Sequence, residues 1–286
     1  MSATGSAAAA PAVPWRLVDS GPGPGAWNLA LDEAIFDAVR ARRSPPTLRL
    51  YGWDAPTLSL GYAQDPARDL DAAACAAAGI AVVRRASGGR AVLHDREVTY
   101  SVAVPAGTTA FGTNLDAAYR AIAAGLLAGL RLLGVDAALA PAVRGRARAA
   151  RHPGCFASAS RHEILAGGRK LVGSAQRRSG GAFLQHGSIL LEGHAERLAR
   201  LLRPNAAGGR TGEGDRGGDA MTGLADLLRH CPEYGEVAAA VAAGCAAAWG
   251  ARLVPGEPTA AEVAAARALT GARGGPTMRD TLFPGG

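Results

Sequence analysis

Lysine is almost absent from this chain of 286 residues, because Lys170 is the single lysine and the other thirty of the 31 Lys and Arg side chains are arginine. An arginine is always charged and presents a planar fork, whereas a lysine is a compact charge on a flexible stem whose pKa shifts readily on burial. One lysine kept among so many arginines indicates a site that needs a small, directed cation. Chance retention on a solvated strand is the alternative explanation, so other residues must support the site.

Long hydrophobic runs and paired cysteines are absent as well. No stretch of about eighteen apolar residues occurs, and residues 1–13 have neither the basic start nor the apolar centre of a signal peptide. We therefore expect a cytoplasmic protein with no membrane partner. The four cysteines form no CxxC pair, which argues against a zinc ribbon and supplies no disulfide framework. They are Cys75, Cys155, Cys231 and Cys245.

Aromatic residues make up only 5% of the chain, and the arginines are spread along it rather than gathered in one stripe. Few side chains are therefore available to stack on bases, which argues against a nucleic-acid partner. The net charge of +7 suits an acidic partner, but charge by itself does not choose between nucleic acid, anionic lipid and an acidic carrier protein.

The composition also sets the expected domain organisation. A hydrophobic fraction of 48% is enough for an ordinary packed core. We expect a disordered segment at residues 1–13, one domain at 14–272 and a flexible tail at 273–286. Inside the domain, the Gly-rich stretch 204–219 is expected to be a flexible loop.

Hydrophobic periodicity places strands in the middle of the chain and helices around them. Asn28 is the expected N-cap of a helix at 29–40, with Asp32 and Glu33 in its early turns suiting the helix dipole. The stretch HEILAGGRKLVGSAQ predicts a hairpin that turns at Gly167-Gly168, and GAFLQHGSILLEG predicts two short strands. Further strands are expected at 47–53, 57–62, 80–85 and 98–104, and further helices at about 66–78, 115–133, 194–202, 234–249 and 259–270. This pattern predicts an α+β fold around a mixed, largely antiparallel sheet flanked by helices.

The stretch RRASGGRAVLHD, residues 84–95, is the first candidate for chemistry. Its glycine pair, Gly88 and Gly89, lets the backbone approach a ligand closely, and the neighbouring arginines can hold a carbonyl or phosphate oxygen. The stretch fits neither the P-loop nor the dinucleotide-binding fingerprint. Taken by itself, it is also compatible with a plain tight turn.

Cys155 is the second candidate, because it lies in the loop HPGCFASAS just before the hairpin that carries Lys170. Its Arg-rich neighbourhood would stabilise a thiolate, whereas Cys75 and Cys245 sit in Ala-rich helices and are expected to be buried and inert. A metal site built from His152, Cys155 and His162 remains a weaker alternative, because the spacing matches no common zinc pattern. No GxSxG elbow supports serine hydrolysis.

Four ordered motifs give the chain a resemblance to a known superfamily. NLALDEAIF, LRLYGWDAPTLSLGY, RRASGGRAVLHDREVTYSV and GRKLVGSAQRRSGGAFLQHGSILL resemble the signatures of the biotin/lipoate ligase and octanoyltransferase superfamily, from about Trp15 to Thr270. The resemblance matches Lys170 to the active-site lysine of that superfamily. It implies the catalytic-domain fold of the biotin and lipoate protein ligases.

Within the superfamily, Cys155 placed fifteen residues before Lys170 resembles the LipM-type octanoyltransferases. The resemblance implies that octanoyl passes from acyl carrier protein, through a thioester on Cys155, to a lysine of the glycine cleavage H protein or another lipoyl domain. It implies no cofactor and no metal. An ATP-dependent lipoate-protein ligase and a noncatalytic lipoyl or basic binding module are the alternatives.

The resemblance also assigns roles to particular residues. Lys170 would lower the pKa of the Cys155 thiol and orient the acyl carbonyl. His94 and His186 are interpreted as satisfied structural histidines or pocket walls rather than as bases. The expected substrate-binding residues are Arg84, Arg85, Gly88, Gly89, Arg90, Ala91, His94, Gly173, Ser174, Ala175 and His186.

Overall fold

The computed structural model describes residues 14–141, 162–203 and 221–273. Within these ranges the strands form two sheets, one of eight strands and one of three. The large sheet pairs β11 with β1 and β1 with β2 in parallel, and its remaining neighbours are antiparallel. In spatial order its strands are β11 (Arg252–Pro255), β1 (Pro14–Gly23), β2 (Thr47–Trp53), β6 (Glu97–Pro105), β10 (Ala182–Leu190), β9 (Arg169–Ser179), β8 (Ile164–Ala166) and β7 (Ala138–Leu139).

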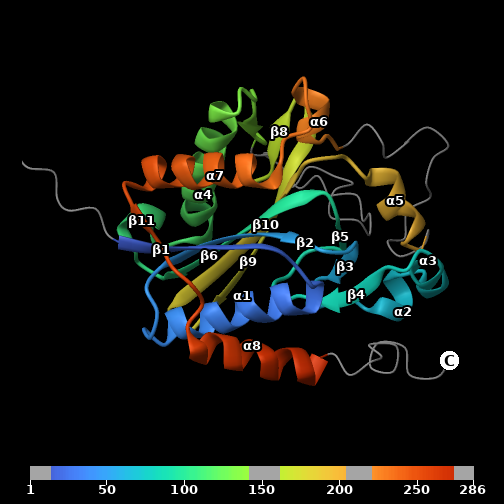
Figure 1. The fold of residues 1–286 in the computed structure, drawn as a ribbon, viewed down its shortest axis with the longest axis horizontal. Helices are drawn as coiled ribbons and strands as arrows, with labels where there is room; N and C mark the ends of the chain where they lie inside the picture. Colours follow the sequence, from blue (N-terminus) through green and yellow to red (C-terminus); the bar gives the residue numbers. More distant parts are fainter. Residues whose placement is uncertain (1–13, 142–161, 204–220, 274–286) are drawn as a thin grey trace, which may run out of the picture.

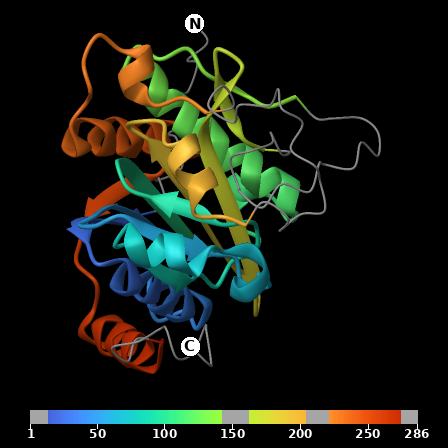
Figure 2. The same cartoon turned by 90° about the vertical axis from the view of Figure 1, so that its right-hand side faces the viewer.

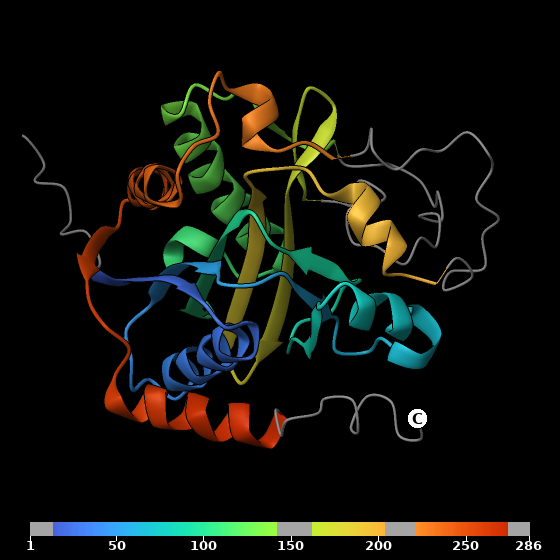
Figure 3. The same ribbon diagram turned by 45° about the vertical axis from the view of Figure 1, so that its right-hand side comes forward.

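Helices cover both faces of this sheet (Figure 1). On one face lie α4 (Leu115–Leu132) and α7 (Tyr234–Trp249), and on the other lie α1 (Gly25–Arg40) and α8 (Ala260–Arg273). Helices α4 and α7 cross closely because glycines occupy the crossing point. A Cβ on Gly244 would lie 2.1 Å from the backbone nitrogen of Gly129. Figure 3 shows α8 running along α1, where the buried pair of Arg16 and Glu262 ties it to β1.

The two faces of the central strands differ in chemistry, although both are buried. Leu48 and Leu50 of β2 belong to the main hydrophobic core beneath α4 and α7. Arg49 and Tyr51 alternate with them and so point to the opposite face, toward α1. Because a strand alternates its side chains between two faces, the polar side chains gather on the α1 face, beside a second hydrophobic cluster that includes Ala103 and Leu184. The candidate site lies among these polar side chains.

The small sheet stands beside the end of the large one and carries the glycine loop. Its strands are β3 (Thr57–Leu60) in the centre, β4 (Ala81–Arg84) parallel to it and β5 (Val92–His94) antiparallel to it. Residues 85–91, between β4 and β5, form the glycine loop. Figure 2 shows this sheet with the short helices α2 (Pro66–Asp69), α3 (Ala72–Ala77) and α5 (Ala195–Arg200) beside it. The other two short helices, η1 (Thr109–Phe111) and α6 (Leu224–Leu227), pack on the core of the large sheet.

The expected α+β architecture and most expected elements are present. The hairpin between β8 and β9 turns at Gly167 and Gly168, whose φ angles of 56° and 77° explain why both positions are glycine. Three details of the sequence prediction were wrong. The first helix begins at Gly25 behind Pro24, because Asn28 is buried in its second turn and bonds to the carbonyls of Gly23 and Gly52 instead of capping. The expected helix at 66–78 is divided into α2 and α3, and the two strands expected within 181–193 are the single strand β10.

In the described ranges, no helix is long and apolar enough to cross a membrane. The expected segments at 1–13 and 204–219 and nearly all of the tail at 273–286 lie outside the described residues, as does Cys155. The domain boundaries stay predictions, with the one difference that Arg273 is the last residue of α8.

Candidate functional site

A small cavity lies on the polar face of the large sheet, between the ends of β2, β6, β9 and β10 and the glycine loop. Its volume of about 30 Å³ accommodates roughly two water molecules, so a longer ligand would have to displace side chains. The described residues that line it are Leu29, Tyr51, Arg85, Val92, His94, Thr99, Gly173, Ser174, Ala175, His186, Gly187 and Ser188. Six of these belong to the set that the sequence predicted: Arg85, His94, Gly173, Ser174, Ala175 and His186.

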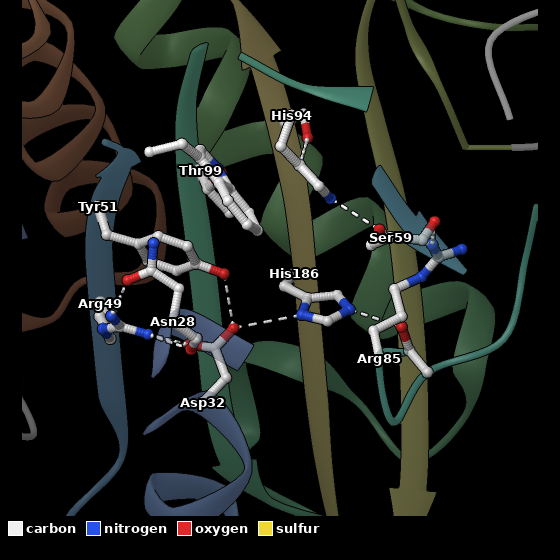
Figure 4. A network of polar contacts seen from close by, with 12 residues as sticks. Asn28, Asp32, Arg49, Tyr51, Ser59, Arg85, His94, Thr99 and His186 are labelled. Carbon is white, nitrogen blue, oxygen red and sulfur yellow. Dashed lines mark hydrogen bonds and ion pairs between the residues drawn. The ribbon is translucent and has the colours of Figure 1, made fainter. Parts of the chain in front are cut away.

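His186 is held between a carboxylate and a hydroxyl (Figure 4). Its Nδ1 lies 3.2 Å from Oδ2 of Asp32, and its Nε2 lies 2.5 Å from Oγ of Ser87. Asp32 comes from α1, His186 from β10 and Ser87 from the glycine loop, and all three are buried. We call this chain of contacts the His186 line.

Asp32 is anionic in this arrangement. Burial by itself would raise the pKa of Asp32, but the charge of Arg49 and the hydrogen bond of His186 outweigh burial and hold that pKa below its usual value. Arg49 donates to Oδ1 at 2.7 Å, and the Tyr51 hydroxyl donates to Oδ2 at 2.8 Å. Burial and the negative charge of Asp32 raise the pKa of Tyr51 well above its usual value, so the phenol stays protonated. An anionic Asp32 accepts a proton-bearing Nδ1, which leaves Nε2 of His186 to accept from Ser87.

His94 is held in a similar way on the other side of the cavity. Its Nδ1 lies 2.9 Å from Oε1 of Glu97, and its Nε2 lies 2.7 Å from Oγ of Ser59. The ring also stacks on Trp53, with 4.0 Å between the centroids and 10° between the planes. We call this chain the His94 line. Burial would raise the pKa of Glu97, but His94, Thr99 and Ser188 outweigh burial and hold it below its usual value.

Arg85 distinguishes the two lines. Its guanidinium donates to Oγ of Ser59 at 3.0 Å, so the Ser59 hydroxyl turns its own hydrogen toward Nε2 of His94. The same guanidinium donates to the carbonyls of Gly88 at 2.9 Å and Arg90 at 2.6 Å and so holds the glycine loop closed. Among the described residues, no guanidinium contacts the Ser87 hydroxyl.

The remaining residues of the predicted glycine-loop site have mostly structural surroundings. Arg84 does not line the cavity, because it donates to the carbonyls of residues 61, 62 and 64 and fixes that turn. Gly88, Gly89, Arg90 and Ala91 form the loop itself and are not among the described lining residues. Gly89, at φ 93°, brings its carbonyl oxygen to 2.1 Å from where a Cβ on Gly61 would stand, which explains the glycine at position 61.

Lys170 lies at the start of β9 and is only 2% exposed. Its ammonium forms a hydrogen-bonded ion pair with Glu163, which precedes β8. The carboxylate of Glu163 compensates the buried positive charge of Lys170. Lys170 is not among the described residues that line the cavity, and it precedes Gly173, which lines it, by about 10 Å along the strand. Its expected partner Cys155 lies outside the described residues.

The metal alternative finds no support in the described part of the chain. No group of three or more metal-ligating side chains occurs there. His162 contacts Asp116 at 2.8 Å and stacks on Tyr119 with 4.7 Å between the ring centroids. The other two proposed ligands, His152 and Cys155, lie outside the described residues.

Sequence reasoning missed the acidic and hydroxyl partners of the site. The motifs that carry Asp32, Arg49 and Ser59 were recognised as motifs, but none of these side chains was assigned to the site, and Asp32 was expected only to suit the helix dipole. Charged or hydrogen-bonding residues at inward positions of otherwise apolar strands were the available signal. The missed residues are Asn28, Asp32, Arg49, Tyr51, Ser59, Ser87, Glu97, Thr99, Glu163 and Ser188.

A larger open hollow of about 930 Å³ lies elsewhere, between α3, α5 and the start of β9. Its walls carry arginines such as Arg96 and Arg197 together with acids such as Asp95 and Glu192. The mixed charge selects no ligand class. No residue of the His94 line or the His186 line is among the described residues that line this hollow. The small cavity is therefore the better candidate for the site of the chemistry.

The family model of the lipoyl protein ligase A/B catalytic domain matches residues 24–246. The chain belongs to this family. Octanoyltransferase LipM of Kyrpidia tusciae is 47% identical over 251 residues, which cover 87% of this chain and 92% of that protein. Octanoyltransferase LipM of Symbiobacterium thermophilum is 42% identical over 264 residues, which cover 91% and 96%. Octanoyltransferase LipM of Bacillus subtilis is 42% identical over 192 residues, which cover 66% and 69%. The resemblance found in the four sequence motifs is thereby confirmed.

Two solved structures share the fold. A bi-partite lipoate protein ligase of Thermoplasma acidophilum has a TM-score of 0.73 at 22% identity and covers 94% of this chain and 96% of its own. A lipoate-protein ligase A bound with ATP has a TM-score of 0.72 at 23% identity and covers 91% and 94%. These likenesses confirm the expected α+β fold of the lipoate protein ligases.

Proposed function

We propose that this octanoyltransferase takes its octanoyl group from acyl carrier protein, holds it as a thioester on Cys155 and passes it to a lysine of the glycine cleavage H protein or another lipoyl domain. The observation that carries the proposal is the match to octanoyltransferases at 42–47% identity over most of the chain. An acyltransferase of protein lipoylation acts on a lipoyl-domain protein, so the noncatalytic alternative is set aside. The donor, the particular acceptor and the cysteine are the proposed parts.

The proposed role of Lys170 rests on its burial and its charge. A thiol with a pKa near 8.5 is mostly protonated at neutral pH, and a nearby cation favours the thiolate. Lys170 is buried and its ammonium is paired with Glu163, which fixes its position. We propose that it stabilises the Cys155 thiolate and orients the acyl carbonyl.

The cavity is proposed to receive the start of the acyl chain. Its walls include the apolar side chains of Leu29 and Val92 next to the backbone of Gly173 and Gly187. Each buried CH₂ group contributes about 0.8 kcal/mol, so an eight-carbon chain supplies enough free energy to part side chains. Because the volume is only about 30 Å³, we propose that the glycine loop moves outward when the chain binds.

The net charge of +7 supports acidic carrier proteins as partners. Positive charge raises the association rate with an acidic protein, and salt screens the attraction over about 8 Å at physiological ionic strength. We further propose that the protein works in the cytoplasm, where its cysteines stay reduced.

Intact-mass spectrometry after mixing with octanoyl acyl carrier protein, without ATP, tests the proposal. We expect an octanoyl adduct on the wild type and on Cys75→Ser and Cys245→Ser, whose thiols are buried, and no adduct on Cys155→Ser. If free octanoate with ATP and magnesium supported much faster transfer than the carrier thioester, the chain would act as an ATP-dependent ligase.

The substitution Lys170→Arg tests the proposed lysine. It keeps the charge but replaces a point donor by a bulkier fork beside Glu163, so we expect slower acylation than in the wild type. In Lys170→Ala the Cys155 thiol should titrate at higher pH, which alkylation rates measured against pH report. Wild-type acylation and an unchanged thiol titration in both folded variants would contradict the role.

A further inference from the structure

Tyr62, which follows β3, is the most exposed large hydrophobic residue of the described ranges, at 68%. The other exposed ones are the aliphatic residues Leu115, Leu132 and Val254. A single apolar side chain on a surface is ordinary. Tyrosine is nevertheless enriched in protein interfaces, because its ring offers a large contact area and loses little conformational entropy on binding. The backbone and the position of Tyr62 therefore decide whether the ring has a role.

The backbone of Tyr62 is held from both sides. Its N–H donates to the carbonyl of Ser87 at 3.0 Å, and the Arg84 guanidinium donates to its carbonyl at 3.1 Å. Residues 61–64, which we call the Tyr62 turn, also close on themselves. The amide of Gln64 donates to the carbonyl of Gly61, and the Gln64 side chain accepts from the amide of Gly61, both at 3.0 Å. A ring presented by a fixed backbone loses less conformational freedom when a partner binds.

Ser87 connects the Tyr62 turn with the small cavity. Its carbonyl accepts from the Tyr62 amide, and its hydroxyl contacts His186, which lines the cavity, at 2.5 Å. A single residue of the glycine loop thus separates the backbone of Tyr62 from the cavity wall. The other described walls are strands of the two sheets and Leu29 of α1, whereas Gly89 of the glycine loop is exposed.

The surroundings of the Tyr62 turn carry a net positive charge. Residues 61–69 and 84–91 contain four arginines and two aspartates. Both aspartates are engaged, because Asp69 pairs with Arg68 and Asp65 caps α2. Arg84 donates to three carbonyls of the turn and forms no ion pair with a described carboxylate. This surface therefore complements a partner with acidic side chains.

A lipoyl domain is the partner whose surface must come this close. The lysine that receives octanoyl carries its amine on a four-carbon stem, so the body of the acceptor stands within one side-chain length of the site. An acyl carrier protein holds its acyl group on a much longer prosthetic arm, so its body can remain at a distance. An exposed ring one residue from the cavity wall therefore fits the acceptor better than the donor.

We infer that Tyr62 is the anchor on which an acidic lipoyl domain docks. The bound domain covers the ring, and the arginines beside the ring attract the acidic side chains around the acceptor lysine. This inference rests on the proposed function for its acceptor. It depends neither on Cys155 nor on the identity of the octanoyl donor.

Steady-state transfer of octanoyl to an unlipoylated lipoyl domain, such as the glycine cleavage H protein, tests the anchor. In Tyr62→Ala we expect the KM for the lipoyl domain to rise roughly tenfold, the usual scale for truncating an interface anchor. The kcat and the KM for the octanoyl donor should change little. Tyr62→Phe keeps the ring and should stay near wild type.

Leu132→Ala is the matched control. Leu132 is 66% exposed and ends α4, on the face of the large sheet opposite to α1. Its truncation removes a similarly exposed apolar side chain far from the glycine loop, so the KM for the lipoyl domain should equal that of the wild type. Since both side chains are exposed, both variants should fold.

Three kinetic outcomes would overturn the inference. The first is a wild-type KM for the lipoyl domain in folded Tyr62→Ala, and the second is an equal rise in Leu132→Ala. The third is a rise in the KM for octanoyl acyl carrier protein instead, which would assign the surface to the donor. A fall in kcat with an unchanged KM would also count against docking, because it would mean that the substitution acts through Ser87 on the cavity.

Binding measured without any donor separates docking from the proposed function. Titration calorimetry with the lipoyl domain should give a higher Kd for Tyr62→Ala and a wild-type Kd for Leu132→Ala. If the wild type formed no amide from the carrier thioester, the proposed function would fail, yet this difference in Kd would still support docking. Equal binding by all the proteins, or none, would overturn docking while octanoyl transfer by the wild type upheld the proposed function.

Discussion

The His94 line and the His186 line share a pattern of serine, histidine and carboxylate, yet their surroundings differ. Around His94 the line ends on the Arg85 guanidinium, and the carboxylate of Glu97 contacts Trp53, Thr99 and Ser188 besides His94. Around His186 the guanidinium stands at the opposite end, where Arg49 pairs with Asp32. The two guanidiniums thus lie at opposite ends of the two lines, one on a hydroxyl and one on a carboxylate.

The difference teaches that hydrogen-bond geometry around a histidine does not by itself assign a role. Both rings are buried, both contact a hydroxyl and both contact a carboxylate. The two rings differ in whether another group donates a hydrogen bond to the serine hydroxyl that the ring contacts. Arg85 donates to the Ser59 hydroxyl, whereas no guanidinium in the described ranges contacts the Ser87 hydroxyl.

The largest expected effect comes from removing the carboxylates. In Asp32→Ala the Arg49 guanidinium, 1% exposed, loses its anion, and we expect the free energy of unfolding to fall by about 3–5 kcal/mol. Glu97 bonds no guanidinium or ammonium among the described residues, so Glu97→Ala should cost less, roughly 1–3 kcal/mol. Urea denaturation of both variants measures the difference. Equal losses would mean that the two lines do not differ in charge as described.

A smaller effect is expected from crowding the glycine loop. In Gly61→Ala the new Cβ would stand 2.1 Å from the carbonyl oxygen of Gly89, so the loop that carries Ser87 must shift. We expect a loss of about 1–3 kcal/mol in unfolding free energy. Gly88→Ala is the matched control, because its Cβ meets nothing within 4 Å and its stability should change little. Equal stability of the two variants would contradict the close approach.

Acid should weaken the contribution of Asp32. Its pKa is lowered in the folded protein, so its stabilisation is complete above the unfolded pKa near 3.8 and is lost as pH falls through the lower folded value. The stability advantage of wild type over Asp32→Asn should therefore be constant near neutral pH and shrink in acid. Unfolding free energies of both proteins across that range measure it. An advantage that grew on acidification would reverse the assigned sign.

The smallest effect is expected at Trp53. Trp53→Phe removes the indole donor to Glu97 at 3.0 Å and to Thr99 at 2.8 Å but keeps a ring against His94. Glu97 keeps its contacts with His94, Thr99 and Ser188, so a loss of about 1 kcal/mol is expected by denaturation. Trp53 also packs against Tyr51, with 6.0 Å between the ring centroids, and the phenyl ring keeps an aromatic side chain there. A loss as large as that of Asp32→Ala would contradict the assignment of the indole donor to the His94 line.

Local sequence signals predicted much of the fold. The β8–β9 hairpin followed from a glycine pair between two apolar runs, and β2 and β6 followed from their length and composition. The first helix was predicted, but its start was misplaced. Asn28 has the chemistry of a cap, and only the packing of α1 against β2 shows that its amide serves the carbonyls of Gly23 and Gly52 instead.

The sequence by itself determined the family, the sheet-and-helix architecture and six of the cavity-lining residues, because these depend on motifs, periodicity and turn chemistry. Only the tertiary structure decided the two histidine lines. Asp32 and His186 are 154 residues apart and meet because β10 pairs with β6 in the register that sets His186 opposite Ser101. A slip of one residue in that pairing would turn His186 to the apolar face, so the contact of Asp32 with His186 exists through strand register and not through any local pattern.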